Sequence, residues 1–191
     1  MRKLVYYVGV SIDGYIAGPA NEVEFYPVAD ELVDWMKTTY PEVLPTPMRP
    51  HIGVPSDTPN HRFDTVIMGR GTYQPGLDIG ATSPYAHLRQ YVVSRSFGKS
   101  ADPAVEVVDH DPLGLVRRLK SEVGGDIWLA GGGNLAGQLL TEIDELIIKS
   151  YPVVAGAGVA AFTDGFRPTA FTPTERKNFA DGVQVSWFTR G

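Results

Sequence analysis

Three consecutive glycines, Gly131, Gly132 and Gly133, lie between an apolar run and a helix-like segment in IWLAGGGNLAGQLL, residues 127–140. Glycine tolerates positive φ and lets a phosphate group approach the backbone closely. The free N–H groups at the start of a following helix favour an anion at that place. We interpret this stretch as a phosphate- or dinucleotide-binding turn, with a purely structural tight turn as the alternative.

The position of this turn differs from that in the standard NAD-binding unit. Gly131, Gly133 and Ala136 satisfy the relaxed pattern G-x-G-x-x-G/A. The standard unit opens its domain and supplies an acidic ribose ligand about 20 residues later. That distance falls here on residues 154–158, which contain no acid. The glycines therefore predict phosphate binding in another arrangement.

Two further apolar runs end in residues that suit phosphate groups. VIMGRGTYQ, residues 66–74, ends in a glycine followed by Arg70 and Thr72, and YVVSRSFGK, residues 91–99, places Arg95 between two serines. Arginine offers a planar fork of donors for a phosphate. Taken alone, Thr72 could be a helix cap and Arg95 a solvated surface charge. Three such strand ends together predict a ligand with several phosphates.

Other chemistries find little support in the composition. The chain has no cysteine, which excludes disulfides, thiolate metal sites and thiol nucleophiles and fits a reducing cytosol. Its four histidines form no i, i+4 pair, so we expect no metal site. The net charge is −5 without a basic cluster, so we expect no nucleic-acid partner. No apolar run approaches the ~20 residues that span a bilayer, and we expect a cytoplasmic protein with no membrane partner.

The elements that must position these residues alternate along the chain. Apolar runs predict strands at residues 4–10, 65–68, 91–93, 105–108, 127–130, 146–150 and 183–188. Helical spacing of apolar residues predicts helices at 31–39, 112–123 and 134–142. The alternation indicates an α/β sandwich with a largely parallel sheet, in which the last strand is an antiparallel edge or hairpin strand.

The segment 40–60 is unusual because it contains six prolines. Such a density forbids a regular helix and disfavours an inner strand. A domain boundary here would leave too short a first part for its own core, so we expect one domain over residues 1–191. The segment is then either an excursion over the active site or a surface loop without a role.

Five motifs follow one another along essentially the whole chain: SIDGYIAG (11–18), VIMGRGTY (66–73), VVSRS (92–96), IWLAGGGNLAGQLL (127–140) and DELIIKSYPVVAGAGVAAF (144–162). In this order they resemble the dihydrofolate reductase superfamily. The chain is most similar to stand-alone reductases that resemble the C-terminal reductase domain of bacterial riboflavin biosynthesis. The resemblance implies a three-layer α/β sandwich with a mostly parallel sheet and an antiparallel C-terminal strand. It is also compatible with a homodimer.

NADPH is the cofactor that the resemblance implies. Ile16 and Ala17 would flank the nicotinamide ring, and Asp13 and Gly14 would shape the loop there. Arg95 would pair with the phosphate on the adenosine ribose. The matching cofactor-binding residues are Ile16, Ala17, Gly69, Arg70, Thr72, Ser94, Arg95, Ser96, Gly131, Gly132, Gly133, Asn134 and Leu135.

The resemblance places Leu32 where folate reductases have the carboxylate that binds the pteridine. Asp34 and Glu31 lie nearby, and Tyr151 is a further candidate proton donor, as is an ordered water. We expect an NADPH-dependent reductase of a pyrimidine- or pterin-like molecule, of the 5-amino-6-(5-phosphoribosylamino)uracil reductase type. The alternatives are a nucleotide-binding module without catalysis, a true dihydrofolate reductase, and a phosphosugar binder that has no use for Arg95.

Overall fold

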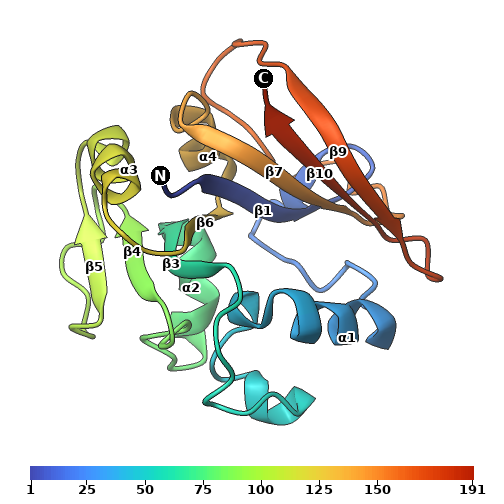
Figure 1. The fold of residues 1–191 in the computed structure, drawn as a ribbon, viewed down its shortest axis with the longest axis horizontal. Helices are drawn as coiled ribbons and strands as arrows, with labels where there is room; N and C mark the ends of the chain where they lie inside the picture. The colour runs from blue at the N-terminus through green and yellow to red at the C-terminus, as the bar shows by residue number, and fades with distance from the viewer.

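An eight-stranded sheet crosses the molecule (Figure 1). The computed structural model describes residues 1–191. In spatial order, the strands are β5 (Val105–Val108), β4 (Arg89–Val93), β3 (Phe63–Gly69), β6 (Asp126–Gly131), β1 (Leu4–Val10), β7 (Ile143–Ser150), β10 (Gln184–Arg190) and β9 (Phe171–Asn178). Two short strands, β2 (Tyr15–Ala17) and β8 (Val159–Ala160), form a separate antiparallel pair.

The strands from β5 to β7 pair in parallel, and β10 pairs antiparallel with both β7 and β9. The expected mostly parallel sheet with an antiparallel C-terminal strand is therefore confirmed. The C-terminal strand is the inner strand of a hairpin, and β9 forms the edge. Sequence patterning missed β9 because its residues, FTPTERKN, are largely exposed and include four charged or amide side chains.

Helices cover both faces of the sheet and complete the three layers (Figure 1). α1 (Asp30–Thr39) and α2 (Arg70–Asp78) pack on one face, and α3 (Pro112–Ser121) and α4 (Gly133–Gln138) pack on the other. Along β1, Val5 and Tyr7 belong to the first core and Leu4 and Tyr6 to the second. Burial on both faces explains the continuous apolar runs in the sequence.

α4 is shorter than its apolar spacing predicts. The N–H of Leu140 donates to the carbonyl of Gly137, three residues back, at 3.3 Å, so the chain leaves the α-helical pattern there. None of the helices combines the length and apolar character needed to cross a membrane.

The proline-rich segment packs against the α1 side of the sheet. It contains two 3-10 helices, η1 (Pro41–Val43) and η2 (Arg49–Ile52). The fully buried Glu42 accepts hydrogen bonds from the backbone N–H groups of Arg62 and Phe63 at 2.8 and 2.9 Å. These bonds hold the segment against the start of β3.

Candidate functional site

A cleft of about 720 Å³ opens where the carboxyl ends of β3, β4 and β6 meet. Gly69, Arg95 and Gly132, which follow or end these strands, all line it. α2 begins at Arg70, which lines the same cleft, and its first turn has no side-chain cap. α3 begins nearby at Pro112, where the Asp111 carboxylate already accepts a hydrogen bond from the N–H of Gly114. Because the first N–H groups of a helix have no partner within it, this arrangement suits an anionic ligand.

The three successive glycines have three different surroundings. Gly131 has φ of +123°, and a Cβ there would lie 3.3 Å from Thr72 Oγ1. A Cβ on Gly133 would lie 1.9 Å from the carbonyl oxygen of Ala160 in β8. A Cβ on Gly132 would meet no atom within 4 Å. Gly131 and Gly133 are thus required by the fold, whereas Gly132 leaves room for a ligand to approach the backbone.

The turns after β3 and β6 lie against each other. A Cβ on Gly69 would be 3.4 Å from the backbone nitrogen of Gly132. Small residues at the two strand ends therefore bring two potential phosphate-binding turns into one cleft, as the sequence patterns suggested.

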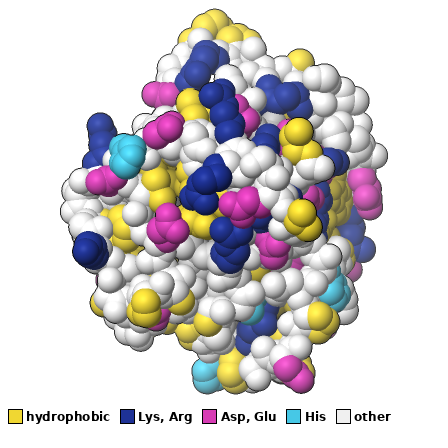
Figure 2. Space-filling view, turned by 60° about the vertical axis from the view of Figure 1, so that its left-hand side comes forward, with side chains coloured by type: hydrophobic (Ala, Val, Ile, Leu, Met, Phe, Trp, Pro, Cys, Tyr) yellow, Lys and Arg dark blue, Asp and Glu magenta, His cyan; other side chains and the backbone are white.

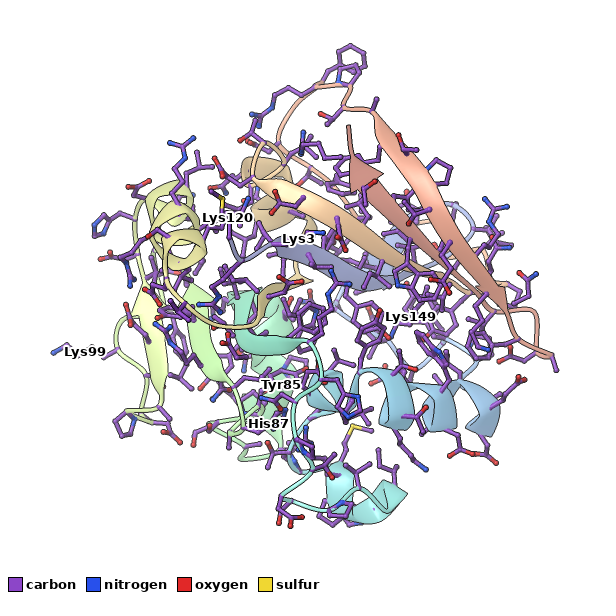
Figure 3. The ribbon with its side chains drawn as sticks, viewed as in Figure 1. Lys3, Tyr85, His87, Lys99, Lys120 and Lys149 are labelled. Atoms are coloured by element: carbon purple, nitrogen blue, oxygen red, sulfur yellow. The ribbon has the colours of Figure 1, made fainter.

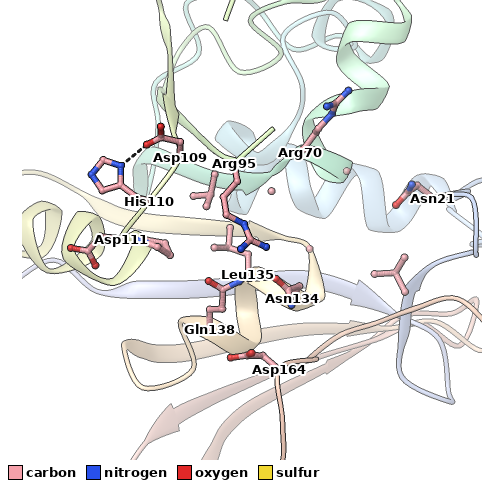
Figure 4. Close-up of a pocket in the computed structure, with 17 residues that line it drawn as sticks. Asn21, Arg70, Arg95, Asp109, His110, Asp111, Asn134, Leu135, Gln138 and Asp164 are labelled. Atoms are coloured by element: carbon pink, nitrogen blue, oxygen red, sulfur yellow. Dashed lines mark hydrogen bonds and ion pairs between the residues drawn. The ribbon is translucent and has the colours of Figure 1, made fainter. Parts of the chain in front are cut away.

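Arg70 and Arg95 supply the free positive charge of the cleft. Both are exposed, and neither forms an ion pair. Of the carboxylates that line the cleft, Asp109 pairs with His110 and Asp164 with Arg167, whereas Asp111 caps α3. Figure 4 shows Arg95 reaching from the end of β4 across the cleft towards α4. On the face that Figure 2 shows, basic and acidic side chains are interspersed.

A second cavity, of about 350 Å³, lies on the α1 side of the sheet. Its walls come from β1, β6, β7, α1 and the proline-rich segment, and they are mostly apolar. Ala130 lines this cavity, and it lies two residues before Gly132, which lines the cleft, so the end of β6 runs between the two hollows. A ligand in the cleft and a second molecule in the cavity could therefore meet at this strand end.

Two ionisable side chains, Lys149 and Tyr151, follow one another along the cavity wall. Burial lowers the pKa of Lys149 to about 8. Burial also raises the pKa of Tyr151 to about 12. A Cβ on Gly9 would lie 2.7 Å from Tyr151 Cε2, so the glycine lets this ring lie against β1. Both side chains are therefore mainly protonated at neutral pH and can donate hydrogen bonds.

Comparison with known proteins places the chain in a family. Residues 2–185 match the model of the RibD C-terminal domain. The chain belongs to the RibD C-terminal domain family. The uncharacterized Bacillus subtilis (strain 168) protein YwjB is 30% identical over 97% of this chain and 97% of its own length. YyaP from the same strain is 28% identical over 95% and 92% of the two chains.

Two solved structures share the fold of this RibD C-terminal domain. A Shewanella sp. PV-4 protein titled "Putative riboflavin biosynthesis protein" superposes with a TM-score of 0.71 at 20% identity, covering 100% of this chain and 99% of that one. A Thermotoga maritima diaminohydroxyphosphoribosylaminopyrimidine deaminase/5-amino-6-(5-phosphoribosylamino)uracil reductase gives a TM-score of 0.64 at 16% identity. The chain covers 57% of that bifunctional protein and is itself covered completely.

Most of the residues predicted to bind a cofactor lie in or against the cleft. Thr72 and Ile16 lie behind Gly131, whose Cβ position is 3.7 Å from Ile16 Cδ1. Ala17 pairs with Val159, which lines the cleft. Ser94 and Ser96 flank Arg95 without lining the cleft themselves. The predicted residues that line it are Gly69, Arg70, Arg95, Gly132, Gly133, Asn134 and Leu135.

The three candidate proton donors lie in different places. Tyr151 lines the apolar cavity. Asp34 is exposed on α1 and pairs with Lys37 at 2.9 Å, and the exposed Glu31 accepts from the N–H of Ala180 at 3.1 Å. Neither carboxylate lines the cleft or the cavity. Leu32 is fully buried in the core on that side, so no carboxylate occupies its place.

Several residues of the site escaped the sequence analysis. Some lie in loops away from the strand ends on which the sequence patterns rest, such as Asn21 and Asp164 in the cleft. The apolar run 146–150 places Lys149 within a predicted strand, but the face of the sheet on which its side chain lies depends on the register with β1. Alternation along β7 could have shown that Ile147, Lys149 and Tyr151 share one face.

Proposed function

We propose that this chain is an NADPH-dependent reductase that passes a hydride to a C=N or C=O bond of a pyrimidine- or pterin-like molecule. The observation that carries this proposal is the adjacency of two unlike hollows across the end of β6. One has open glycine backbone and unpaired arginines, and the other is apolar. A dinucleotide with several phosphates suits the first hollow, and a flat ring suits the second.

The cleft has the donor set that NADPH requires. The open position at Gly132 leaves space for a pyrophosphate, and neither arginine forms an ion pair with the carboxylates that also line the cleft. Arg95 is the residue we assign to the additional phosphate on the adenosine ribose. The residues we assign to the rest of the cofactor are Ile16, Ala17, Gly69, Arg70, Thr72, Ser94, Ser96, Gly131, Gly133, Asn134 and Leu135. When bound, the cofactor supplies the hydride.

The chain's own residues position the acceptor and exclude water. The apolar walls of the cavity lower the local polarity and keep bulk water from the reacting bond. Tyr151 is the proton donor we assign among the candidates, because it alone lines the cavity. Its raised pKa keeps the hydroxyl protonated at neutral pH.

The first acceptor to test is 5-amino-6-(5-phosphoribosylamino)uracil, followed by pterins and simple carbonyl compounds. NADPH oxidation that depends on one of these acceptors would support the proposal, and Tyr151→Phe should lower kcat with little change in NADPH affinity. No NADPH oxidation with any acceptor would contradict the reductase assignment.

A nucleotide-binding module without catalysis is the second candidate. It is favoured by one observation, the buried Leu32 in place of a carboxylate on α1. Tight NADPH binding without turnover over the same acceptors would support it, and reproducible hydride transfer would exclude it.

A further inference from the structure

Lys149 places an ammonium group in the apolar cavity without a carboxylate partner. Its strand β7 pairs with β1 so that Lys149 lies opposite Gly9, and its side chain extends towards α1 (Figure 3). Nζ lies 3.7 Å from Met36 Sδ and 4.8 Å from the centroid of the Tyr7 ring. A thioether and an aromatic face are weak partners for a desolvated cation. The lowered pKa of Lys149 reflects the same lack of compensation.

The hydroxyl of Tyr7 is a second polar group beside this cavity, and it has no partner at all. Tyr7 is 3% exposed and lines the cavity, and its hydroxyl has no hydrogen-bond partner in the chain. Buried hydroxyl groups are nearly always hydrogen-bonded, so an orphan indicates a missing partner. Tyr7 and Lys149 come from adjacent strands, and both reach the same hollow. The protein supplies no oxygen acceptor for either of these two donors.

The remaining walls limit what this acceptor can be. They consist of aliphatic side chains and of the aromatic rings of Tyr85, Trp128 and Tyr151, which favour a ring. Lys149 is the only lysine or arginine that lines the cavity. A phosphate dianion inside it would be met by a single cation, whereas one carbonyl or ionised ring oxygen would be fully matched.

We propose that Lys149 Nζ and the Tyr7 hydroxyl form an oxygen-binding site that selects a flat ring bearing a carbonyl or ionised ring oxygen. Any phosphate on such a molecule stays outside the cavity. This assignment rests on the proposed function in taking the bound molecule to be the hydride acceptor. The binding site itself stands on the unpartnered hydroxyl of Tyr7 and the weakly partnered ammonium of Lys149, and it can be tested without cofactor.

The test is a fluorescence titration of the full, cofactor-free chain with lumazine, a pteridinedione. Lys149→Met removes the charge at similar length, and Tyr7→Phe removes only the hydroxyl. The matched control is Lys177→Met, because Lys177 Nζ also lies over an aromatic ring, 5.2 Å from the centroid of Phe179, but outside the cavity. We expect about tenfold weaker lumazine binding for each cavity variant and an unchanged affinity for the control.

A second readout separates a binding role from a packing role. In protein whose lysines carry 13C-labelled methyl groups, lumazine should shift the NMR signal of Lys149 and raise its pKa. Millimolar inorganic phosphate should leave lumazine binding unchanged. Unaltered lumazine affinity in both folded cavity variants, or a Lys149 signal that ignores lumazine, would overturn the proposal.

Failure of the oxygen-binding site can be distinguished from failure of the reductase assignment. Lumazine binding that depends on Lys149, in a chain that binds no NADPH, would refute the reductase and keep the oxygen site. NADPH-dependent turnover that Lys149→Met and Tyr7→Phe leave unchanged would support the reductase assignment and refute the oxygen-binding site.

Discussion

Gly132 and Gly133 are adjacent in sequence, yet a substitution at Gly132 should affect ligand binding and one at Gly133 should affect stability. A side chain at 132 would enter the cleft, because its Cβ meets nothing within 4 Å. A side chain at 133 would collide with the backbone of β8, because its Cβ would lie 1.9 Å from the Ala160 oxygen. Gly132 has φ of −81°, which any residue can adopt. We therefore predict that Gly132→Val blocks the ligand and that Gly133→Ala damages the fold.

The magnitudes follow from these surroundings. Gly132→Val should change the free energy of unfolding by less than about 1 kcal/mol, as for other substitutions without a steric conflict. It should weaken NADPH binding by about 1.5–3 kcal/mol, the value of hydrogen bonds to a charged group, which is a factor of about 10–150 in Kd. Gly133→Ala should destabilise the protein by about 1–3 kcal/mol or more, the cost of overpacking.

Isothermal titration calorimetry with NADPH and urea unfolding measure the two quantities separately. Gly132→Ala serves as the graded control, since its single methyl group should weaken binding less than the valine side chain. If Gly132→Val bound NADPH as tightly as the unmodified chain, the phosphates would not run along this backbone. If it unfolded as readily as Gly133→Ala, position 132 would not be open.

Three further predictions concern charged residues. Arg95→Ala should raise the Kd for NADPH about tenfold or more and leave the Kd for NADH nearly unchanged, and the effect should be smaller at high salt. The control is Arg176→Ala, at an exposed arginine of β9. Equal losses of affinity for both cofactors would contradict the assignment. Lys149 has a pKa of about 8 in the folded chain, whereas its ordinary value is 10.5. Between pH 8 and pH 10.5 the unfolded state therefore binds more protons than the folded state. The free energy of unfolding should rise with pH over this range. Lys149→Met should abolish this rise and stabilise the protein at pH 7 by up to about 3 kcal/mol, and a parallel pH profile in both proteins would argue against a desolvated ammonium. Hydrogen bonds from the Ser11 hydroxyl and from the amides of Ala155 and Gly156 lower the pKa of Asp13 to about 2. Their stabilising contribution is therefore fully present above pH 3.8, the ordinary pKa of the group, and is lost as the pH falls through about 2. Asp13→Asn should speed amide exchange at Ala155 and Gly156 at pH 7, and unchanged exchange would show that the carboxylate does not hold this loop.

Residues next to regular elements were the part of the site that sequence could predict. Gly69, Arg70, Arg95 and Gly132 follow apolar runs, and parallel strands bring their carboxyl ends to one edge of the sheet. The sequence therefore indicated a shared cleft without any knowledge of the order of the strands.

The apolar cavity could not be predicted in the same way. Its walls combine α1 and the adjoining proline-rich segment with β1, β6 and β7, which come from distant parts of the sequence. The apolar residues of these walls resemble ordinary core. The edge strand β9 was missed for the opposite reason, because its exposed residues carry no apolar run. Both features depend on tertiary packing, which local patterns do not encode.

The most direct test of the account is a calorimetric titration of the unmodified chain with NADPH and, in parallel, with NADH. We predict saturable binding of NADPH and clearly weaker binding of NADH, because Arg95 is the residue we assign to a phosphate that only NADPH carries. Failure of both cofactors to bind at millimolar concentration would contradict the reductase assignment and leave the cleft to a different phosphate ligand.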